Sequence, residues 1–225
     1  ELGSGFKIAM RDLAIRGAGN LLGRQQHGFI DSVGYDLYVQ MLKDAVAKKQ
    51  GKQVRLVSDA EIDLDLEAYL PSEYIADPRQ KIEIYKRIRQ LQNQAQFDEV
   101  QADLLDRFGD YPSSVANLLE IGRLKMLADQ IQVKSIQQVD RKFIIIFAKQ
   151  FANYLTARDL LEALAQTTLK ATIKNESGCF NLILNQQPKS ELLEVITQFE
   201  KLFAFLADSE NQRSKGKKNE TKTKQ

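Results

Sequence analysis

Alternating apolar and polar residues predict a short strand at 61–67. Ile62, Leu64 and Leu66 alternate with acidic residues, and a period of two is typical of a strand that buries one face. Pro71 should end the extended stretch, because proline cannot donate a hydrogen bond to a strand ladder. The outer face of this strand is expected to be wholly acidic, formed by Glu61, Asp63, Asp65 and Glu67.

A helical period replaces the alternation after Asp77-Pro78. An acidic capping residue followed by proline is a typical helix start, because proline already has the backbone angle that the first helical position needs. The apolar stripe of this helix is predicted to contain Ile82, Tyr85 and Ile88. Its basic residues are expected elsewhere on the helix: Lys81, Lys86, Arg87 and Arg89.

Two more helices are predicted before residue 131. The first covers roughly 98–107 and should stop at Gly109, since glycine favours the backbone conformation that follows a helix. The second begins after Pro112, with Ser113 or Ser114 as its cap. Its apolar side is predicted from the residues at helical spacing, which are Val115, Leu118, Leu119, Leu124, Leu127 and Ala128.

Two β-hairpins are predicted in the second half of the chain. The strands of the first are 133–139 and 142–148, and those of the second are 169–175 and 179–185. Both pairs are rich in β-branched and aromatic residues and are separated by short polar turns. The turns are Asp140-Arg141 and Glu176-Ser177-Gly178.

Helices at about 156–166 and from Ser190 to Leu206 complete the predicted fold. The last helix should bury Leu192, Leu193, Ile196, Phe199, Leu202, Phe203 and Leu206. The tail 208–225 contains no apolar residue after Ala207 and is expected to be disordered. The fold class is therefore α+β, with a helical layer packed on a small and mainly antiparallel sheet.

The N-terminal part differs from the rest in its glycine content. Seven of the twelve glycines lie within residues 1–34. Residues 4–13 have helical spacing, although alternating apolar residues leave a short strand open as the other interpretation. A glycine-rich loop at 16–34 and an amphipathic helix at 36–50 follow, and 51–60 is a polar linker. The sequence thus predicts a helix-loop-helix segment ahead of the α+β domain.

The charge is distributed unevenly, although the net charge is only +2. Residues 1–55 contain nine Lys/Arg and five Asp/Glu, whereas 59–69 contains five acidic residues and no basic one. Residues 70–207 contain seventeen of each sign, and 208–225 contains six basic and three acidic residues. A neutral domain is a poor candidate for binding a phosphate backbone, which needs a basic face. The region 70–207 is expected to contact proteins instead.

The motifs of several enzyme classes are absent from the sequence. No phosphate-binding loop of the Gly-x-x-x-x-Gly-Lys-Ser/Thr type occurs. The glycines at 17, 19 and 23 have the wrong spacing for a dinucleotide fingerprint. The single histidine, His27, and the single cysteine, Cys179, cannot build a transition-metal cage. We therefore expect no catalytic residue, no cofactor and no metal in this chain.

The remaining bulk features point to a cytoplasmic protein. No stretch of about eighteen apolar residues is present to cross a membrane. The opening residues also lack the layout of a signal peptide. One cysteine permits no internal disulfide, which fits a reducing compartment.

The segment 12–28 is the one candidate site, because its arginines stand next to glycines. Arg16 precedes Gly17 and Gly19, and such a backbone can approach a phosphate while the guanidinium binds it. Gln25 and Gln26 offer both hydrogen-bond donors and acceptors. The residue pattern alone fits equally well a tight surface loop whose arginines form salt bridges to Asp12 and Asp31.

A resemblance to a known family bears on that choice. Residues 5–28 read Gly-Phe-x-Ile-Ala-x-x-Asp-Leu-x-Ile-Arg-Gly-x-Gly-x-Leu-Leu-Gly-x-x-Gln-x-Gly. This pattern resembles the translocation motif of transcription-repair coupling factors and of the helicase RecG. The downstream pattern resembles the coupling factors alone, at 33–38, 70–71, 85–88 and 105–112. A chain that starts at Glu1, just before such a motif, is expected to be a piece of a longer protein.

The resemblance implies roles for individual residues. The motif couples ATP hydrolysis in neighbouring RecA-like lobes to movement on duplex DNA, so ATP and Mg²⁺ belong to the parent motor. Arg16 would couple the nucleotide state to translocation, and Gln26 would lie at the loop that moves along the DNA. Arg11 is a further candidate, as are Gly17 and Gly19. His27 replaces the serine that is usual in the family, so Gln25 and Gln26 both remain candidates.

The resemblance also implies a division of the chain into four parts. These are the translocation motif at 1–50, a linker and acidic strand at 51–69, a regulatory α+β domain at 70–207 and the basic tail at 208–225. The family's C-terminal domain, about 59–207 here, would cover the parent protein's own N-terminal module, which recruits the excision-repair protein UvrA. RNA polymerase and duplex DNA would be partners of the parent protein. The alternatives are a helix-turn-helix DNA reader at 78–131 and a generic protein-assembly domain.

Overall fold

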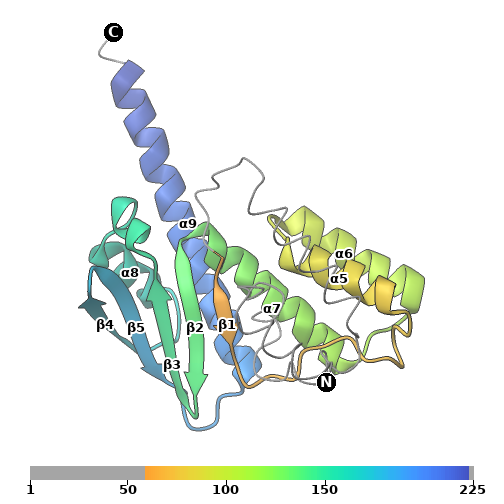
Figure 1. Cartoon of the computed structure of the whole chain (residues 1–225). Helices are drawn as coiled ribbons and strands as arrows, with labels where there is room; N and C mark the ends of the chain where they lie inside the picture. Colours follow the sequence, from red (N-terminus) through yellow and green to blue (C-terminus); the bar gives the residue numbers. More distant parts are fainter. Residues whose placement is uncertain (1–58, 223–225) are drawn as a thin grey trace, which may run out of the picture. The chain divides into compact units, whose positions relative to one another are not determined.

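The computed structural model describes residues 59–222 (Figure 1), which divide into two compact units. The described part of the first unit is 61–126, and the second unit contains 59–60 and 127–222. The division of the described residues falls between Met126 and Leu127, inside one long helix. The predicted helix-loop-helix at 1–50 and most of the linker lie outside the described residues.

The first unit begins with strand β1 (Glu61–Asp63), which is shorter than predicted. The backbone N–H of Leu66 donates to the carbonyl of Leu64 at 2.9 Å, and this tight turn interrupts the regular strand. Burial nevertheless alternates beyond it, because Ala68 and Leu70 are buried like the apolar residues of the strand. The period of two therefore predicted the buried side correctly although the strand ladder ends early.

Helix α5 (Pro78–Arg89) starts as predicted, with the Asp77 carboxylate accepting a hydrogen bond from the Arg79 N–H at 2.9 Å. The predicted stripe of Ile82, Tyr85 and Ile88 is buried. The prediction was wrong for Lys81, which is only 2% exposed. Lys81 lies one turn before Tyr85 on the same helix face, so its side chain follows the buried stripe. Its ammonium group donates to Ser72 Oγ at 2.9 Å, and burial lowers its pKa.

Helices α6 (Gln94–Phe108) and α7 (Ser113–Gln130) follow. Helix α6 starts four residues earlier than predicted, because the side chain of Asn93 caps it by accepting from the Gln96 N–H at 2.9 Å. It ends before Gly109, whose φ of 79° is costly for other residues. Helix α7 buries residues around much of its circumference, including Val115, Leu118, Leu119, Ile121, Leu124 and Met126.

Gly122 of helix α7 permits close contact with Ile88 of helix α5. A Cβ atom built on Gly122 would lie 2.5 Å from Ile88 Cγ2, which is shorter than any normal carbon–carbon contact. Ile88 is fully buried, so its methyl group has no solvent-facing side to move into. This helix pair therefore depends on the absence of a side chain at residue 122.

Gly122→Ala is expected to destabilise the chain by up to about 2 kcal/mol, because the overpacking cost of about 1–3 kcal/mol is offset only in part by the helix-propensity gain of about 1 kcal/mol. Chemical denaturation followed by circular dichroism measures the change. Combining Gly122→Ala with Ile88→Ala should cost less than the sum of the two single changes. A stabilising Gly122→Ala, as helix propensity alone predicts, would show that the contact is not tight.

One five-stranded sheet has the strand order β1-β2-β3-β5-β4 (Figure 1). The predicted hairpins are confirmed as β2 (Val133–Val139) with β3 (Lys142–Phe147), and β4 (Ala171–Glu176) with β5 (Cys179–Asn185). Both hairpins are antiparallel, and so is the pairing of β3 with β5. The turn residues adopt positive φ angles, as tight hairpin turns require, at Asp140, Ser177 and Gly178.

Two helices and one short 3₁₀ helix complete the second unit: η2 (Lys149–Asn153), α8 (Ala157–Ala165) and α9 (Leu192–Lys222). Phe199 of α9 packs edge-on against Phe143 of β3, with ring centres 5.5 Å apart. The predicted burial of α9 is confirmed except at its start, where Leu192 is half-buried and Leu193 is 42% exposed. The first turn of the helix extends past the apolar core, so these two leucines were wrongly predicted.

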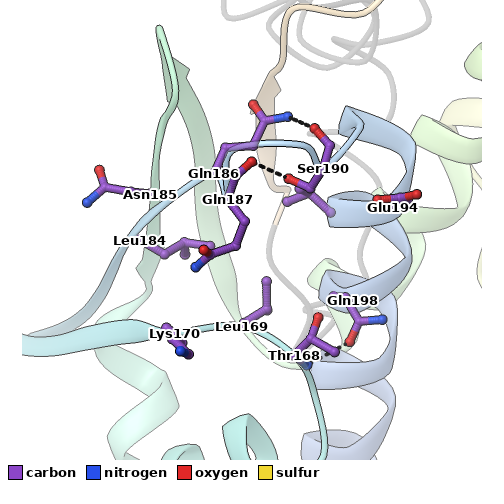
Figure 2. A pocket seen from close by; sticks show the side chains of 11 residues that line it. Thr168, Leu169, Lys170, Leu184, Asn185, Gln186, Gln187, Ser190, Glu194 and Gln198 are labelled. Carbon is purple, nitrogen blue, oxygen red and sulfur yellow. Dashed lines mark hydrogen bonds between the residues drawn. The ribbon is translucent and has the colours of Figure 1, made fainter.

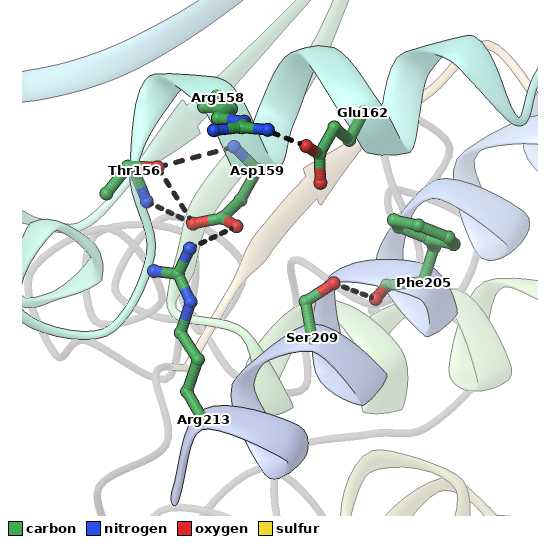
Figure 3. Close-up of polar contacts among 7 residues, drawn as sticks. All are labelled: Thr156, Arg158, Asp159, Glu162, Phe205, Ser209 and Arg213. Carbon is green, nitrogen blue, oxygen red and sulfur yellow. Dashed lines mark hydrogen bonds and ion pairs between the residues drawn. The ribbon is translucent and has the colours of Figure 1, made fainter. Parts of the chain in front are cut away.

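Helix α9 continues to Lys222, although we expected residues after 207 to be disordered. Glutamate, glutamine, arginine and lysine are good helix formers, so a helix that has already formed can extend through them without an apolar stripe. A long-range contact with helix α8 helps to hold this extension. The Arg213 guanidinium lies 2.7 Å from Oδ1 of Asp159 in helix α8 (Figure 3).

Asp159 also caps its own helix. Its Oδ2 accepts from the Thr156 N–H at 2.6 Å and from the Thr156 hydroxyl at 2.9 Å (Figure 3). The hydroxyl in turn accepts from the Asp159 N–H at 3.4 Å, which completes a capping box. With 5% of its side chain exposed, Asp159 thus joins the start of α8 to the extension of α9.

The described residues form five α-helices and a five-stranded, mostly antiparallel sheet, so the predicted α+β class is confirmed. In the second unit, helix α9 lies on the sheet face that carries Phe143, as the prediction of a helical layer on a sheet requires.

Candidate protein-binding surface

The residues predicted to form the translocation site lie outside the described residues. They are Arg11, Arg16, Gly17, Gly19, Gln25 and Gln26. Their roles therefore stay predictions. Within residues 59–222 the candidate sites are an exposed face of helix α6 in the first unit and a cavity in the second.

Helix α6 has two contrasting sides. Phe97, Val100 and Leu104 are buried at helical spacing. The opposite side is exposed and mostly acidic, and we define it as the α6 outer face, formed by Asp98, Glu99, Ala102, Leu105 and Asp106. The whole helix contains four acidic residues and one arginine, so the face has a negative potential.

Leu105 is the apolar centre of this face. Its side chain is 44% exposed, although leucine is among the residues most often buried. It follows the buried stripe by one position, so the helical period turns it towards solvent. The sequence contained this signal, because an apolar residue outside the stripe was visible in the pattern, but we assigned Leu105 no role.

Ion pairs fix the inner edge of α6 to helix α5. The Asp103 carboxylate accepts hydrogen bonds from Arg87 and, at 3.1 Å, from Arg107. Arg107 also lies 3.2 Å from Oε1 of Glu83. Exposed ion pairs contribute little singly, but a network that joins two helices restrains their relative position. The α6 outer face is therefore presented on a braced element.

The network also shifts the pKa of Asp103. Burial acts to raise this pKa, but the hydrogen bonds from Arg87 and Arg107 outweigh it and hold the pKa below its usual value. A carboxyl with a lowered folded-state pKa stabilises the fold above the pH at which the unfolded group titrates. That contribution is lost as the pH falls through the folded-state pKa, so the network weakens only in acid.

Tyr74 braces the C-terminal end of α6. Its hydroxyl lies 2.8 Å from the carbonyl oxygen of Gly109 and 3.1 Å from that of Leu104. Its ring packs on Phe108 with centres 5.8 Å apart. The Arg107 guanidinium lies 5.0 Å from the Phe108 ring centre on the same end of the helix. The turn that follows Leu105 is therefore held in place by aromatic and polar contacts together.

Tyr85 fixes the extended stretch onto helix α5. Its buried hydroxyl accepts a hydrogen bond from the Leu70 N–H at 2.8 Å. Burial raises the pKa of Tyr85, so the hydroxyl stays protonated. Residues 85–88 and 70–71 both belong to the pattern that resembles the coupling factors. This hydrogen bond gives a structural reason why a tyrosine occurs at residue 85 and why the extended stretch ends beside it, at Leu70-Pro71.

The cavity of the second unit has a volume of about 300 Å³ (Figure 2). It lies where β4 begins, β5 ends and α9 begins, and its apolar lining is formed by Leu169, Leu184 and Val195. Gln198 Oε1 accepts from the Thr168 N–H at 3.0 Å across one side. Neither this cavity nor another part of residues 59–222 contains a group of three or more metal-ligating side chains suited to an ion.

None of the helices described in residues 59–222 combines the length and apolar character needed to span a bilayer.

Comparison with known proteins identifies the family. Residues 64–156 match the model of the TRCF domain. A transcription-repair-coupling factor of Staphylococcus epidermidis is 49% identical over 164 residues, which cover 72% of this chain and 14% of that protein. The protein of the same name from Bacillus subtilis is 53% identical over 139 residues, covering 61% of this chain and 12% of that protein.

A solved structure covers the same region. The crystal structure of the C-terminal domain of a transcription-repair coupling factor matches with a TM-score of 0.67 and 38% identity. The match covers 71% of this chain and 99% of the solved one, so the solved domain is present here almost in full. Together with the family model and the relatives, this match shows that the chain belongs to the transcription-repair coupling factor family and is a C-terminal region of such a protein.

Proposed function

We propose that this chain is the C-terminal part of an ATP-dependent DNA translocase that displaces stalled RNA polymerase and recruits nucleotide excision repair in the cytoplasm. Membership of the coupling factor family supports the proposal. Because the chain spans 14% of the length of the Staphylococcus epidermidis relative, the activity belongs to the whole parent protein. ATP and Mg²⁺ would bind in the parent's motor lobes.

The two parts of the chain have different proposed roles. Residues 1–50 couple ATP hydrolysis to movement on duplex DNA through Arg16 and Gln26, with Gln25, Arg11, Gly17 and Gly19 as further participants. Residues 59–207 cover the N-terminal module that recruits UvrA until the motor engages RNA polymerase. The resemblance in 5–28 and the neutral charge of 70–207 support this division.

The α6 outer face is the proposed contact for the N-terminal module. The observation that carries this assignment is the 44% exposure of Leu105 among acidic residues on a braced helix. An apolar residue surrounded by polar ones matches the core-and-rim arrangement of protein–protein contacts. The negative potential of the face selects a partner surface with arginine or lysine around an apolar pocket.

The helix-turn-helix alternative is disfavoured by the burial of helix α7 and by the charge of helix α6. A recognition helix must expose side chains that reach base edges in the major groove. Helix α7 buries residues around much of its circumference, and α6 is acidic, so it would be repelled by phosphates. Neither helix has the surface that this reading requires.

Leu105→Arg in the full-length parent protein is expected to weaken the contact with the N-terminal module by at least about tenfold, because it puts a cation opposite a basic partner surface. UvrA binding by the resting protein should rise correspondingly. Titration of UvrA against the full-length variant, without ATP or RNA polymerase, measures the effect.

Leu193→Arg is the matched control, because Leu193 is exposed to a similar extent (42%) on helix α9. It should leave UvrA binding unchanged. Equal effects of the two variants would point to a general consequence of an added arginine. Unchanged UvrA binding in a folded Leu105→Arg protein would refute the assignment of the α6 outer face.

A further inference from the structure

The outer edge of strand β4 is open to a further strand. Strand β4 ends the sheet order, and among the described residues it pairs with β5 alone. Within the second unit, no strand is drawn beyond it in Figure 1. An edge strand presents unpaired N–H and C=O groups in the spacing that another extended chain needs. The edge therefore provides the backbone hydrogen-bonding groups that a peptide-binding site needs.

The two faces of β4 specify different side chains. Ala171 and Ile173 are half-buried and pair with the buried Leu184 and Leu182, so they continue the core face of the sheet. Thr172 and Lys174, and Lys170 just before the strand, are exposed. A strand added beside β4 would place alternate residues next to each face. Apolar residues would suit the core face, and acidic residues would suit the lysines.

The cavity adds a specific contact at the start of the strand (Figure 2). Ala171 is too small to cover Leu184 opposite it, and the cavity lined by Leu169, Leu184 and Val195 lies there. Leu169 points into it from the strand side, and Gln198 lies on the α9 side (Figure 2). One aliphatic side chain of an added strand can enter this space.

The acidic residues nearby already have partners. Glu194 accepts from the Glu191 N–H at 3.3 Å, within the start of α9. Glu176 accepts from the Asn181 side chain at 3.1 Å. These hydrogen bonds come from neutral groups and leave the charges in place, but Lys170 and Lys174 outnumber the single carboxylate, Glu176, on the exposed face of the strand. This charge selects an acidic partner chain.

A second copy of β4 is a poor occupant. Antiparallel pairing of two β4 strands centred on Thr172 would set Lys170 of one copy opposite Lys174 of the other, twice. Like charges directly opposite each other in a sheet are destabilising. Lysines on an edge strand are a known means by which proteins prevent self-pairing.

We infer that β4 and the adjoining cavity form a docking site for an extended peptide segment that alternates acidic and aliphatic residues. Backbone pairing with β4 supplies the affinity. Lys170, Lys174 and the cavity supply the specificity. The site lies in the second unit and is independent of the α6 outer face, so either can be correct without the other.

The test uses the full 225-residue chain and the capped peptide Glu-Val-Glu-Ile-Glu-Val-Glu, followed by NMR of the backbone amides. Binding should shift the amide signals of 168–176 and 184–187 and slow hydrogen exchange along β4. The corresponding lysine peptide, and a glutamate peptide with proline in place of both valines, should each bind at least about tenfold more weakly. Equal binding of the three peptides would overturn the proposal, as would shifts confined to other regions.

Charge reversal on the protein separates this site from nonspecific attraction. Lys170→Glu combined with Lys174→Glu should weaken peptide binding by about tenfold or more, and both residues are exposed, so the fold is not at risk. Lys142→Glu with Lys201→Glu changes the net charge equally at two other exposed lysines and should have little effect. Similar losses in both double variants would overturn the assignment to β4.

Discussion

Arg16→Ala in the full-length parent protein is expected to abolish displacement of stalled RNA polymerase while ATP hydrolysis continues. A residue that couples the nucleotide state to movement is not required for breaking the phosphate bond, which we propose occurs in the motor lobes of the parent protein. Its loss should therefore leave an ATPase that does not move along DNA. Steady-state ATP hydrolysis and polymerase release from a stalled template, measured on the same preparation, check both parts.

Arg24→Ala is the matched control for this prediction. Arg24 belongs to the same predicted glycine-rich loop, at a position that the family pattern leaves open. The control should retain both hydrolysis and displacement. Retained displacement by Arg16→Ala would refute its proposed role, and loss of hydrolysis as well would place Arg16 in nucleotide binding instead.

Asp159→Ala is expected to lower the free energy of unfolding by about 1–3 kcal/mol, the largest stability change among these predictions. The substitution removes the reciprocal half of the capping box but keeps the N-cap bond from the backbone N–H of residue 159 to the Thr156 hydroxyl. It leaves the N–H of Thr156 without its acceptor, at a cost of about 1–3 kcal/mol. It also removes the partner of Arg213, and this loss adds little because the arginine is 46% exposed.

Two arginine variants separate these contributions. Arg213→Ala removes only the ion pair and should cost about 1 kcal/mol, with faster hydrogen exchange in the extension of α9. Arg158→Ala removes the pair with Glu162 on the same helix, where Arg158 is 84% exposed, and should stay within about 0.5 kcal/mol. Urea denaturation of the three variants measures the series. A stability loss for Asp159→Ala no greater than that for Arg158→Ala would contradict the structural role of the cap.

Local signals in the sequence were sufficient where a single residue determines the backbone. Asp77-Pro78 marked the start of α5, and Gly109 marked the end of α6. The hairpin turn at Ser177-Gly178 was found as a short polar stretch between two strand-like runs, and its glycine adopts a positive φ without steric cost. These features depend on neighbours in the chain, so they can be read without knowledge of the tertiary contacts.

Features that depend on distant residues were missed. The burial of Lys81 required knowledge of Ser72 and of the extended stretch that precedes α5. The extension of α9 was missed because the partner of Arg213 lies 54 positions away. Leu193 was assigned to the core by its spacing alone, although the core ends before the first turn of its helix.

The candidate sites show the same division. The resemblance in 5–28 supplied names and roles for residues that lie outside the described part of the chain. The α6 outer face was missed although Leu105 and Arg107 both belong to the matching pattern. A pattern shows which residues recur, but only burial distinguishes the exposed Leu105 from its buried neighbour Leu104.

Helix α9 combines two segments that are stabilised in different ways. Its buried apolar residues end at Leu206, whereas the helix continues to Lys222. Up to Leu206 the helix should therefore melt together with the sheet on which it packs, in one cooperative transition. Beyond it the helix relies mainly on helix propensity, aided by the Asp159–Arg213 ion pair, so on warming this part should unwind gradually from its C-terminal end. The part of α9 beyond Leu206 would consequently act as a spacer for a fluorophore or affinity handle fused after Gln225. The distance between that label and the sheet would change with temperature.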